Sequence, residues 1–348
     1  MEHSDAVGLA ALIVNPIKVD ARHLAALLAE HCAAAGWADP LILETTIDDP
    51  GQGLARRALD AGAAKVFVAG GDGTVRAVAE VMDGSGVELT IVPSGTGNLL
   101  ARNIRLPLVD PEDMIRAAFD GAATPIDVGI AKLRRADGST EEHGFVVMAG
   151  MGLDAAMIAN TSAKLKKRMG WVAYVDGAAR SLPNAKPFRI VYQLLGAGGR
   201  DPEPDDRKTQ TRLHSAKVQS ILVANCGALP AGIELFPTAS FADGLLDVAL
   251  IQPSGPLGWV GVWRKVWWDN SVLRRFRAGL RLAESHRNTA VRYLTGFGIE
   301  IAVPEPRPVQ LDGDELGEAT RFYATIHPGG LLVTVPHGHR LAPAGSPA

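Results

Sequence analysis

"AGGDGTVRAVAE", residues 69–80, places three glycines, an aspartate and a threonine between the apolar run KVFV and a helix-like pattern. Glycine allows positive φ and lets a ligand approach backbone N–H groups without a Cβ in the way. The start of the following helix adds a favourable potential for an anion. The stretch therefore predicts a strand, a phosphate-binding turn and a helix.

The same order of strand and helix recurs through the first 120 residues. The apolar runs are GLAALIVN, LILETT, KVFVAG and ELTIVPSG, and the alanine-rich helical stretches are 20–35, 52–62, 74–83 and 97–103. This alternation predicts an α/β domain with a mostly parallel sheet covered on both faces. A second glycine-rich turn, PSGTGN at 93–98, follows the fourth run. Ligands bind at such strand ends in open α/β sheets.

The pattern changes after Pro125. Runs rich in valine and isoleucine follow, among them HGFVVMAG, RIVYQLL, KVQSILVAN and LLDVALI, with helical stretches near 152–182 and 256–284 and a polar surface loop at 196–212. We therefore predict an α/β nucleotide-binding domain at 1–125 and a β-rich sandwich domain at 126–327. The C-terminal segment 328–340 is a candidate to return to the first domain.

Composition excludes several classes of protein. The 348 residues are 47% hydrophobic, which is ample for the cores of two domains. A net charge of −3 argues against nucleic-acid binding. No uncharged apolar run reaches the roughly 18 residues of a membrane span, and the first apolar segment lacks a basic leader. Cys32 and Cys226 lack the spacing of a zinc or redox site. We expect a cytoplasmic protein with reduced thiols.

The glycine loops do not match other common motifs. In a dinucleotide fingerprint the third glycine would stand at Arg76, and the P-loop, GxSxG and HExxH patterns are absent. A single glycine-rich turn could simply be a tight turn that binds no ligand. Two such turns at strand ends, with Asp72 in one of them, favour a nucleotide site in which the hydroxyls of Thr74 and Thr96 bind phosphate.

Six motifs in order resemble the diacylglycerol kinase catalytic family, the lipid kinases that also include sphingosine and ceramide kinases. They are NPIKV (15–19), GGDGTV (70–75), VPSGTGNLLARNIRLP (92–107), GMGLDA (150–155), ANCGALPAGIELFPTASFADGLLDVALI (224–251) and QLDGDEL (310–316). The resemblance spans nearly the whole chain. It implies an α/β nucleotide domain followed by a β-sandwich, with the active site in the cleft between them.

The resemblance also implies an activity: transfer of the γ-phosphoryl group of ATP to a lipid hydroxyl, with ATP and Mg²⁺ as cofactors. The residues implied for the nucleotide are Asn15, either Thr45 or Thr46, Gly70, Gly71, Gly73, Thr74, Gly95, Thr96 and Asn98. Because the acceptor hydroxyl loses a proton, a carboxylate must accept it. Asp312 or Asp314 is implied as that base and Asp72 as organiser of metal and phosphates, although in some relatives the aspartate matching Asp72 has the base role.

A carboxylate turn, SFADGLLD at 240–247, matches the family's accessory magnesium site. The resemblance implies that Asp243 supplies its side chain, and Ser240 and Leu245 their backbone carbonyls, to a hard cation with oxygen ligands. The residues by themselves favour an Asp-Gly hairpin between TASF and LLDVALI.

The sequence departs from the family pattern at three places. The common NPxSG motif ends here in Ile17-Lys18-Val19, so that Lys18 is a candidate to supply a phosphate-binding charge. The common asparagine after GGDGTV is Arg76, and the usual DGE is Asp312-Gly313-Asp314.

Residues 259–287 carry seven Lys/Arg against two Asp/Glu, and Trp259, Trp263 and Trp267 are four residues apart. They would share one helical face. This face is expected either to contact a membrane surface, placing the protein peripherally at the inner membrane face, or to pack into the core or a dimer interface of a homo-oligomer. The partners we predict are a lipid alcohol and a membrane surface, with no nucleic acid.

The preferred function is a diacylglycerol kinase that makes phosphatidic acid. A sphingoid-base or ceramide kinase is an alternative within the same family. An NAD kinase shares the GGDGT loop, but DGLLD followed by DGD belongs to the lipid-kinase pattern. A non-catalytic nucleotide- or lipid-binding module is the alternative from another class.

Overall fold

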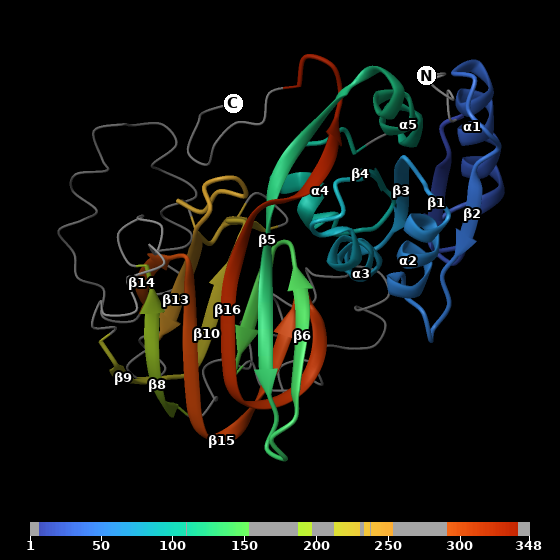
Figure 1. The fold of residues 1–348 in the computed structure, drawn as a ribbon. Helices are drawn as coiled ribbons and strands as arrows, with labels where there is room; N and C mark the ends of the chain where they lie inside the picture. The colour runs from blue at the N-terminus through green and yellow to red at the C-terminus, as the bar shows by residue number, and fades with distance from the viewer. Residues whose placement is uncertain are drawn as a thin grey trace, which may run out of the picture. The chain divides into compact units, whose positions relative to one another are not determined.

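The computed structural model describes residues 7–108, 110–152, 187–196, 212–229, 233–236, 238–252 and 291–339. The chain forms two compact units, the first from Met1–Val128 and Pro328–Leu341, the second from Gly129–His327 and Ala342–Ala348. Strands β5 (Ala122–Arg134) and β16 (Asp314–Val335) each run through both units (Figure 1). The predicted helix at 256–284, nearly all of that at 152–182 and most of the polar loop at 196–212 lie outside the described residues.

The first unit contains a parallel sheet with the strand order β16-β4-β3-β1-β2. Its strands are β1 (Ala10–Val14), β2 (Leu41–Glu44), β3 (Lys65–Gly70), β4 (Glu88–Pro93) and the last part of β16. All five residues of β1 are buried, as expected for a strand whose two faces are both covered. The predicted α/β fold with a mostly parallel sheet is confirmed.

Helices cover both faces of this sheet. Leu28 of α1 (Ala21–Ala34) and Ile115 of α5 (Pro111–Asp120) share a core cluster with Phe67 of β3. Helices α2 (Gln52–Asp60) and α3 (Asp72–Met82) pack on the other face (Figure 1). The sequence analysis missed α5, although Asp110 before Pro111 is a helix-start signal: the Asp110 carboxylate accepts the Glu112 N–H at 2.9 Å.

A buried polar chain fixes the end of β16 to β4 within the first unit. The Thr334 hydroxyl lies 2.6 Å from the Thr90 hydroxyl and donates to Glu88 Oε1 at 2.6 Å. Glu88 also pairs with the Lys65 ammonium group. Because buried polar groups are costly when unpaired, these hydrogen bonds favour the observed register of β16 against β4 over a shifted one.

The second unit is an antiparallel β structure. Its further strands are β6 (Thr140–Phe145), β7 (Met148–Met151), β8 (Phe188–Leu195), β9 (His214–Val218), β10 (Ser220–Ala224), β13 (Leu246–Ile251), β14 (Val291–Gly296) and β15 (Gly298–Leu311), with β11 (Ala228–Leu229) and β12 (Ile233–Glu234) as a separate pair. The first part of β15 pairs with β8 and its last part with β7, and the pairing of β15 with β16 shifts register between Ala302 and Arg307. A strand that changes partners in this way passes from one layer to the next. The predicted β-sandwich is confirmed.

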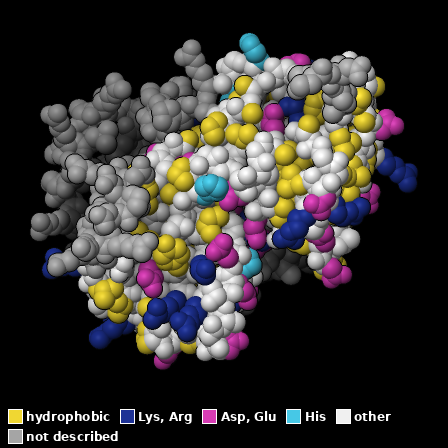
Figure 2. Space-filling model, in the orientation of Figure 1, with side chains coloured by type: hydrophobic (Ala, Val, Ile, Leu, Met, Phe, Trp, Pro, Cys, Tyr) yellow, Lys and Arg dark blue, Asp and Glu magenta, His cyan; other side chains and the backbone are white. Residues whose placement is uncertain are grey.

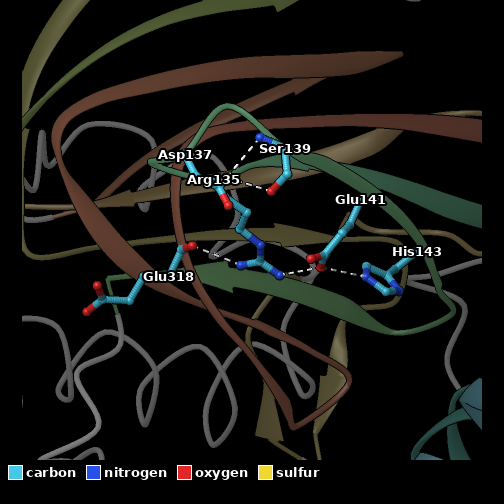
Figure 3. Close-up of polar contacts among 6 residues, drawn as sticks. All are labelled: Arg135, Asp137, Ser139, Glu141, His143 and Glu318. Carbon is cyan, nitrogen blue, oxygen red and sulfur yellow. Dashed lines mark hydrogen bonds and ion pairs between the residues drawn. The ribbon is translucent and has the colours of Figure 1, made fainter.

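The β5–β6 hairpin is tied to β16 by Arg135 within the second unit (Figure 3). Its guanidinium group donates to the Glu318 carbonyl at 2.9 Å and to Glu141 at 2.5 Å, and His143 lies 3.5 Å from the same carboxylate. Hydrogen bonds from Arg135 and His143 hold the pKa of Glu141 below its ordinary value. Basic and acidic side chains are interspersed on the face shown in Figure 2.

Candidate active site

The carboxyl ends of the parallel strands bring several predicted nucleotide residues to one edge of the first unit. Asn15 follows β1 and donates its N–H to the Ala69 carbonyl at 2.8 Å. Thr45 follows β2, is buried, and donates its N–H to the Val14 carbonyl at 2.9 Å. The Thr46 hydroxyl accepts the Asp49 N–H at 3.0 Å, and Lys18 is exposed. The strand order therefore places two chain segments, those after β1 and β2, at the same edge of the sheet as the glycine loops.

The two glycine loops lie against each other. A Cβ at Gly95 would come within 3.2 Å of Gly71 Cα and 3.4 Å of the Gly70 carbonyl oxygen. Because backbone atoms cannot give way as a flexible side chain can, this close approach favours glycine at position 95. The two predicted loops are therefore adjacent in the structure, and their binding of phosphate stays a prediction.

Gly71, unlike Gly95, is in open space. It is the N-cap of α3 with φ −84° and ψ 177°, a conformation that any residue adopts, and a Cβ there would meet nothing within 4 Å. Neither the backbone nor the packing of the described residues therefore requires glycine here. The open position lies at a helix N-terminus, where backbone N–H groups attract anions. That a phosphate group of ATP occupies this position stays a prediction.

Asp72 links the two loops. Its Oδ1 accepts the Leu99 N–H at 2.6 Å, 27 residues further along the chain, and a Cβ at Gly97 would overlap its Oδ2. Burial raises the pKa of the Asp72 carboxyl above its ordinary value, while hydrogen bonds from backbone N–H groups, chiefly Leu99, and the charge of Arg102 act in the opposite direction. Asp72 is thus a half-buried carboxylate that holds the second loop in place.

Other groups complete the second loop. Asn98 adopts φ 46°, and its side-chain oxygen accepts the Gly95 N–H at 2.8 Å. Arg102 Nε donates to the Gly97 carbonyl at 2.7 Å, and Thr96 is exposed. The predicted contact of Asn98 with a nucleotide stays a prediction, because in the structure this side chain shapes the loop.

Thr74 and Arg76, in the first turns of α3 after the first glycine loop, are both buried. Thr74 is buried, and a Cβ at Gly70 would meet Thr74 Cβ at 2.8 Å, so the threonine packs on that glycine. Arg76, 5% exposed, pairs with Glu80 at 3.1 Å one turn along α3. The arginine that departs from the family pattern is therefore a buried residue of the helix.

The DGD motif forms the tight turn between β15 and β16 in the second unit. Asp312 has φ 49° and Gly313 φ 95°, and Leu311 pairs with Asp314 across the turn. Asp312 is 5% exposed, and its carboxylate accepts the N–H groups of Val146, Val147 and Met148 at 2.7, 2.9 and 2.8 Å. Asp314 is half-buried at the start of β16.

The predicted magnesium residues lie in a turn before β13. Asp243 is exposed, and its Oδ1 accepts the Leu245 N–H at 3.0 Å. Residues 238–241, which include the start of the turn at Ser240, form no strand, so the Asp-Gly hairpin favoured by the residues alone is wrong. The described residues contain no group of three or more His, Cys, Asp or Glu that could hold a metal ion. A carboxylate with backbone carbonyls in a tight turn nonetheless suits a hydrated Mg²⁺.

A buried carboxylate near this turn was not predicted. Asp247 Oδ1 accepts the hydroxyls of Thr295 at 2.9 Å and Thr238 at 3.2 Å. Burial raises its pKa, and the two hydrogen bonds oppose that change. Asp247 fixes the end of the turn to β14. Its place in the motif DGLLD is the one sequence feature that could have identified it as a site residue.

The tryptophans 259, 263 and 267 lie outside the described residues, and no helix in the described part of the chain is long and apolar enough to cross a membrane. The predicted site residues of the first unit thus share one edge, and Asp312, Asp314 and Asp243 belong to turns of the second unit. That the active site lies between the two domains stays a prediction.

The comparisons with known proteins cover both units. Residues 10–131 match the diacylglycerol kinase catalytic domain, and residues 146–335 match the YegS C-terminal NAD kinase beta sandwich-like domain. The probable lipid kinase YegS-like of Pseudomonas aeruginosa is 32% identical over 84% of each chain. The chain belongs to the YegS-like lipid kinases. A diacylglycerol kinase of Bacillus subtilis is 24% identical over 75% of this chain and 76% of its own.

Solved structures agree with this YegS-like fold. A putative diacylglycerol kinase from Bacillus anthracis has a TM-score of 0.69 at 20% identity, covering 95% of this chain and 98% of the other. Yeast NADH kinase has a TM-score of 0.53 at 10% identity, covering 96% and 85%, so that it shares the fold. As a member of the lipid kinases, the protein is an ATP-using phosphotransferase with an alcohol group as acceptor.

Proposed function

We propose that this YegS-like kinase transfers the γ-phosphoryl group of ATP to diacylglycerol, forming phosphatidic acid. The acceptor is supported by the order of the six motifs and by the similarity to the diacylglycerol kinase of Bacillus subtilis. The structural observation that carries the phosphoryl-transfer site is the open Cα of Gly71 at the N-terminus of α3, next to the second glycine loop.

The two loops supply what phosphoryl transfer needs from the donor side. Backbone N–H groups at the start of α3 would hold the phosphates, and the contact between Gly95 and Gly71 keeps both loops at a fixed separation. Fixed donors stabilise the charge on the phosphoryl oxygens without reorganising during the reaction. Lys18, exposed beside Asn15, is proposed to add a positive charge.

Mg²⁺ is proposed as the counter-ion of the phosphates, with Asp243 and the carbonyls of Ser240 and Leu245 as its accessory protein site. When bound it would neutralise phosphate charge. The acceptor hydroxyl oxygen forms the new bond to phosphorus, the bond to the β-phosphate oxygen breaks, and a carboxylate takes the hydroxyl proton. Asp312, Asp314 and Asp72 are the candidates for that carboxylate, and the raised pKa of Asp72 suits a proton acceptor.

A lipid panel tests the acceptor. The purified protein is incubated with Mg-ATP and diacylglycerol, ceramide, sphingosine or NADH in separate reactions, and products are identified by mass spectrometry. We expect phosphatidic acid as the main product. Phosphorylation of ceramide or sphingosine in preference would contradict diacylglycerol as acceptor, and phosphorylated NADH with no lipid product would reject lipid phosphorylation itself.

We also propose that the segment with Trp259, Trp263 and Trp267 contacts the inner membrane face, where a lipid acceptor is found. Co-sedimentation with vesicles containing anionic lipid should be weakened in the Trp263→Ala/Trp267→Ala variant. Equal sedimentation of this variant and the wild type would exclude the membrane contact and favour packing of these tryptophans inside the protein or a dimer.

A further inference from the structure

Two motifs of the second unit, those that contain Asn225 and Asp312, meet at the backbone of residues 146–148. On one side their N–H groups are accepted by the Asp312 carboxylate, and Asp312 donates its own N–H to the Met148 carbonyl at 2.8 Å. On the other side the Val147 carbonyl accepts the N–H groups of Asn225 at 2.9 Å and Cys226 at 3.0 Å. We call these residues the Asp312 cluster: Val146, Val147, Met148, Asn225, Cys226 and Asp312.

The side chains of Asn225 and Cys226 reinforce the cluster. Asn225 Nδ2 donates to the Val146 carbonyl at 3.0 Å, and Cys226 Sγ lies 3.3 Å from the same oxygen. Asn225 is fully buried and Cys226 is 1% exposed. Inside a protein such hydrogen bonds are stronger than in water, and a broken one leaves a costly unpaired group. The arrangement is therefore rigid.

The position of Asp312 in its turn is unusual. A non-glycine residue at φ 49° is uncommon, and aspartate and asparagine tolerate this region better than most residues. In this conformation the carboxylate accepts the N–H groups of residues 146–148, and the half-buried Asp314 begins the next strand. Both carboxylate oxygens of Asp312 already accept backbone N–H groups, Oδ1 two and Oδ2 one.

We propose that Asp312 is a positioning residue of the kinase and not its proton acceptor. Three hydrogen bonds to the charged carboxylate favour that charged form and occupy three of its roughly four lone-pair sites, which leaves little room to receive a proton from a substrate. The carboxylate instead fixes the turn that presents Asp314 and holds it to the segment before β7. This inference rests on the proposed function only in that the residue being positioned serves phosphoryl transfer to a lipid hydroxyl.

Two substitutions separate positioning from proton transfer. Asp312→Asn keeps φ near 49° and one oxygen that can accept the N–H groups of Val147 and Met148, but it sets an NH₂ group against the Val146 N–H. Asp312→Gly adopts the same φ without strain and removes every acceptor. We therefore expect a graded loss of kcat, with about a tenfold fall for Asp312→Asn and a larger one for Asp312→Gly, since small misplacements in an active site cost up to about 100-fold.

The measurements are kcat and the KM for ATP at a temperature well below unfolding, the pH dependence of kcat, and amide hydrogen exchange at Val146, Val147 and Met148. We expect an unchanged KM for ATP, an acidic limb of the pH profile that survives in Asp312→Asn, and faster exchange at the three amides in both variants. Hydrogen exchange needs no substrate, so it tests the cluster even if diacylglycerol is not the acceptor.

Two results would overturn the proposal. If both variants lost activity equally, by the factor of about 100 to 10,000 typical of a missing general base, and the acidic limb disappeared, Asp312 would be the proton acceptor. If kcat per folded molecule were unchanged in Asp312→Gly and only the unfolding temperature fell, Asp312 would be a purely structural residue.

Discussion

Gly71→Ala is the substitution that best separates binding of ATP from folding. The added Cβ would meet nothing within 4 Å, and φ −84° suits alanine. Alanine is a poorer helix N-cap than glycine by about 0.5–1 kcal/mol. It also restricts the unfolded chain, which stabilises the protein by about 0.4–1 kcal/mol. The two effects nearly cancel, so we expect the free energy of unfolding to change by no more than about 0.5 kcal/mol.

The effect of Gly71→Ala on ATP should be much larger. If a phosphate approaches the N–H groups at the start of α3, the new methyl group occupies its path. Loss of one charge-assisted hydrogen bond costs about 1.5–3 kcal/mol, which corresponds to an increase of about 10- to 150-fold in the dissociation constant for ATP. Calorimetric titration with ATP measures this, and urea denaturation measures the free energy of unfolding.

Gly95→Ala is the matched control. Its Cβ would press on Gly71 Cα and the Gly70 carbonyl, so this variant should lose both stability and ATP affinity. An unchanged ATP affinity in a folded Gly71→Ala protein would refute the argument that the open position holds a phosphate. A large loss of stability in that variant would show instead that glycine is needed there for folding.

Three further predictions follow from the buried polar groups and close contacts. Burial raises the pKa of Asp72, so the charged carboxylate lowers the free energy of unfolding of the native state. This destabilisation is fully present above the raised pKa and disappears on acidification below the ordinary value of about 3.9. Asp72→Asn keeps the acceptor for the Leu99 N–H and should therefore be more stable than wild type to urea at pH 7, by a margin that shrinks toward pH 4. Equal or lower stability at pH 7 would contradict this reasoning, whereas a loss of kcat alongside the gain would fit a catalytic carboxylate. Thr334→Val removes the donor to Glu88 and should lower the free energy of unfolding by about 1–3 kcal/mol in urea, with a smaller effect for exposed Thr96→Val. Gly227→Ala places a Cβ over the Phe236 carbonyl oxygen and should cost at least about 2 kcal/mol in the same assay; a neutral result would mean that this backbone contact is not tight.

The elements of the first unit were largely predictable because their signals are local. Four apolar runs with helical stretches between them gave the parallel strands, and glycines at the ends of two runs gave the loops. The missed helix α5 had a local signal too, Asp110 followed by Pro111. The family motifs likewise predicted the β-sandwich, while the detailed order of its antiparallel strands depends on pairings between distant segments.

The sequence by itself determined the two fold types, the lipid-kinase family and the residues that deserved testing at the site. Only the tertiary structure decided what several of these residues contact. Asp72 meets Leu99 from 27 residues away, Asp312 meets Val146 from 166 residues away, and Thr334 meets Thr90 from 244 residues away. Periodicity and turn chemistry act over a few neighbouring residues, whereas a carboxylate finds its hydrogen-bond donors only after strands from distant parts of the chain have paired. For that reason the sequence could name Asp312 as a site residue, and the structure was needed to show that its oxygens are already bound.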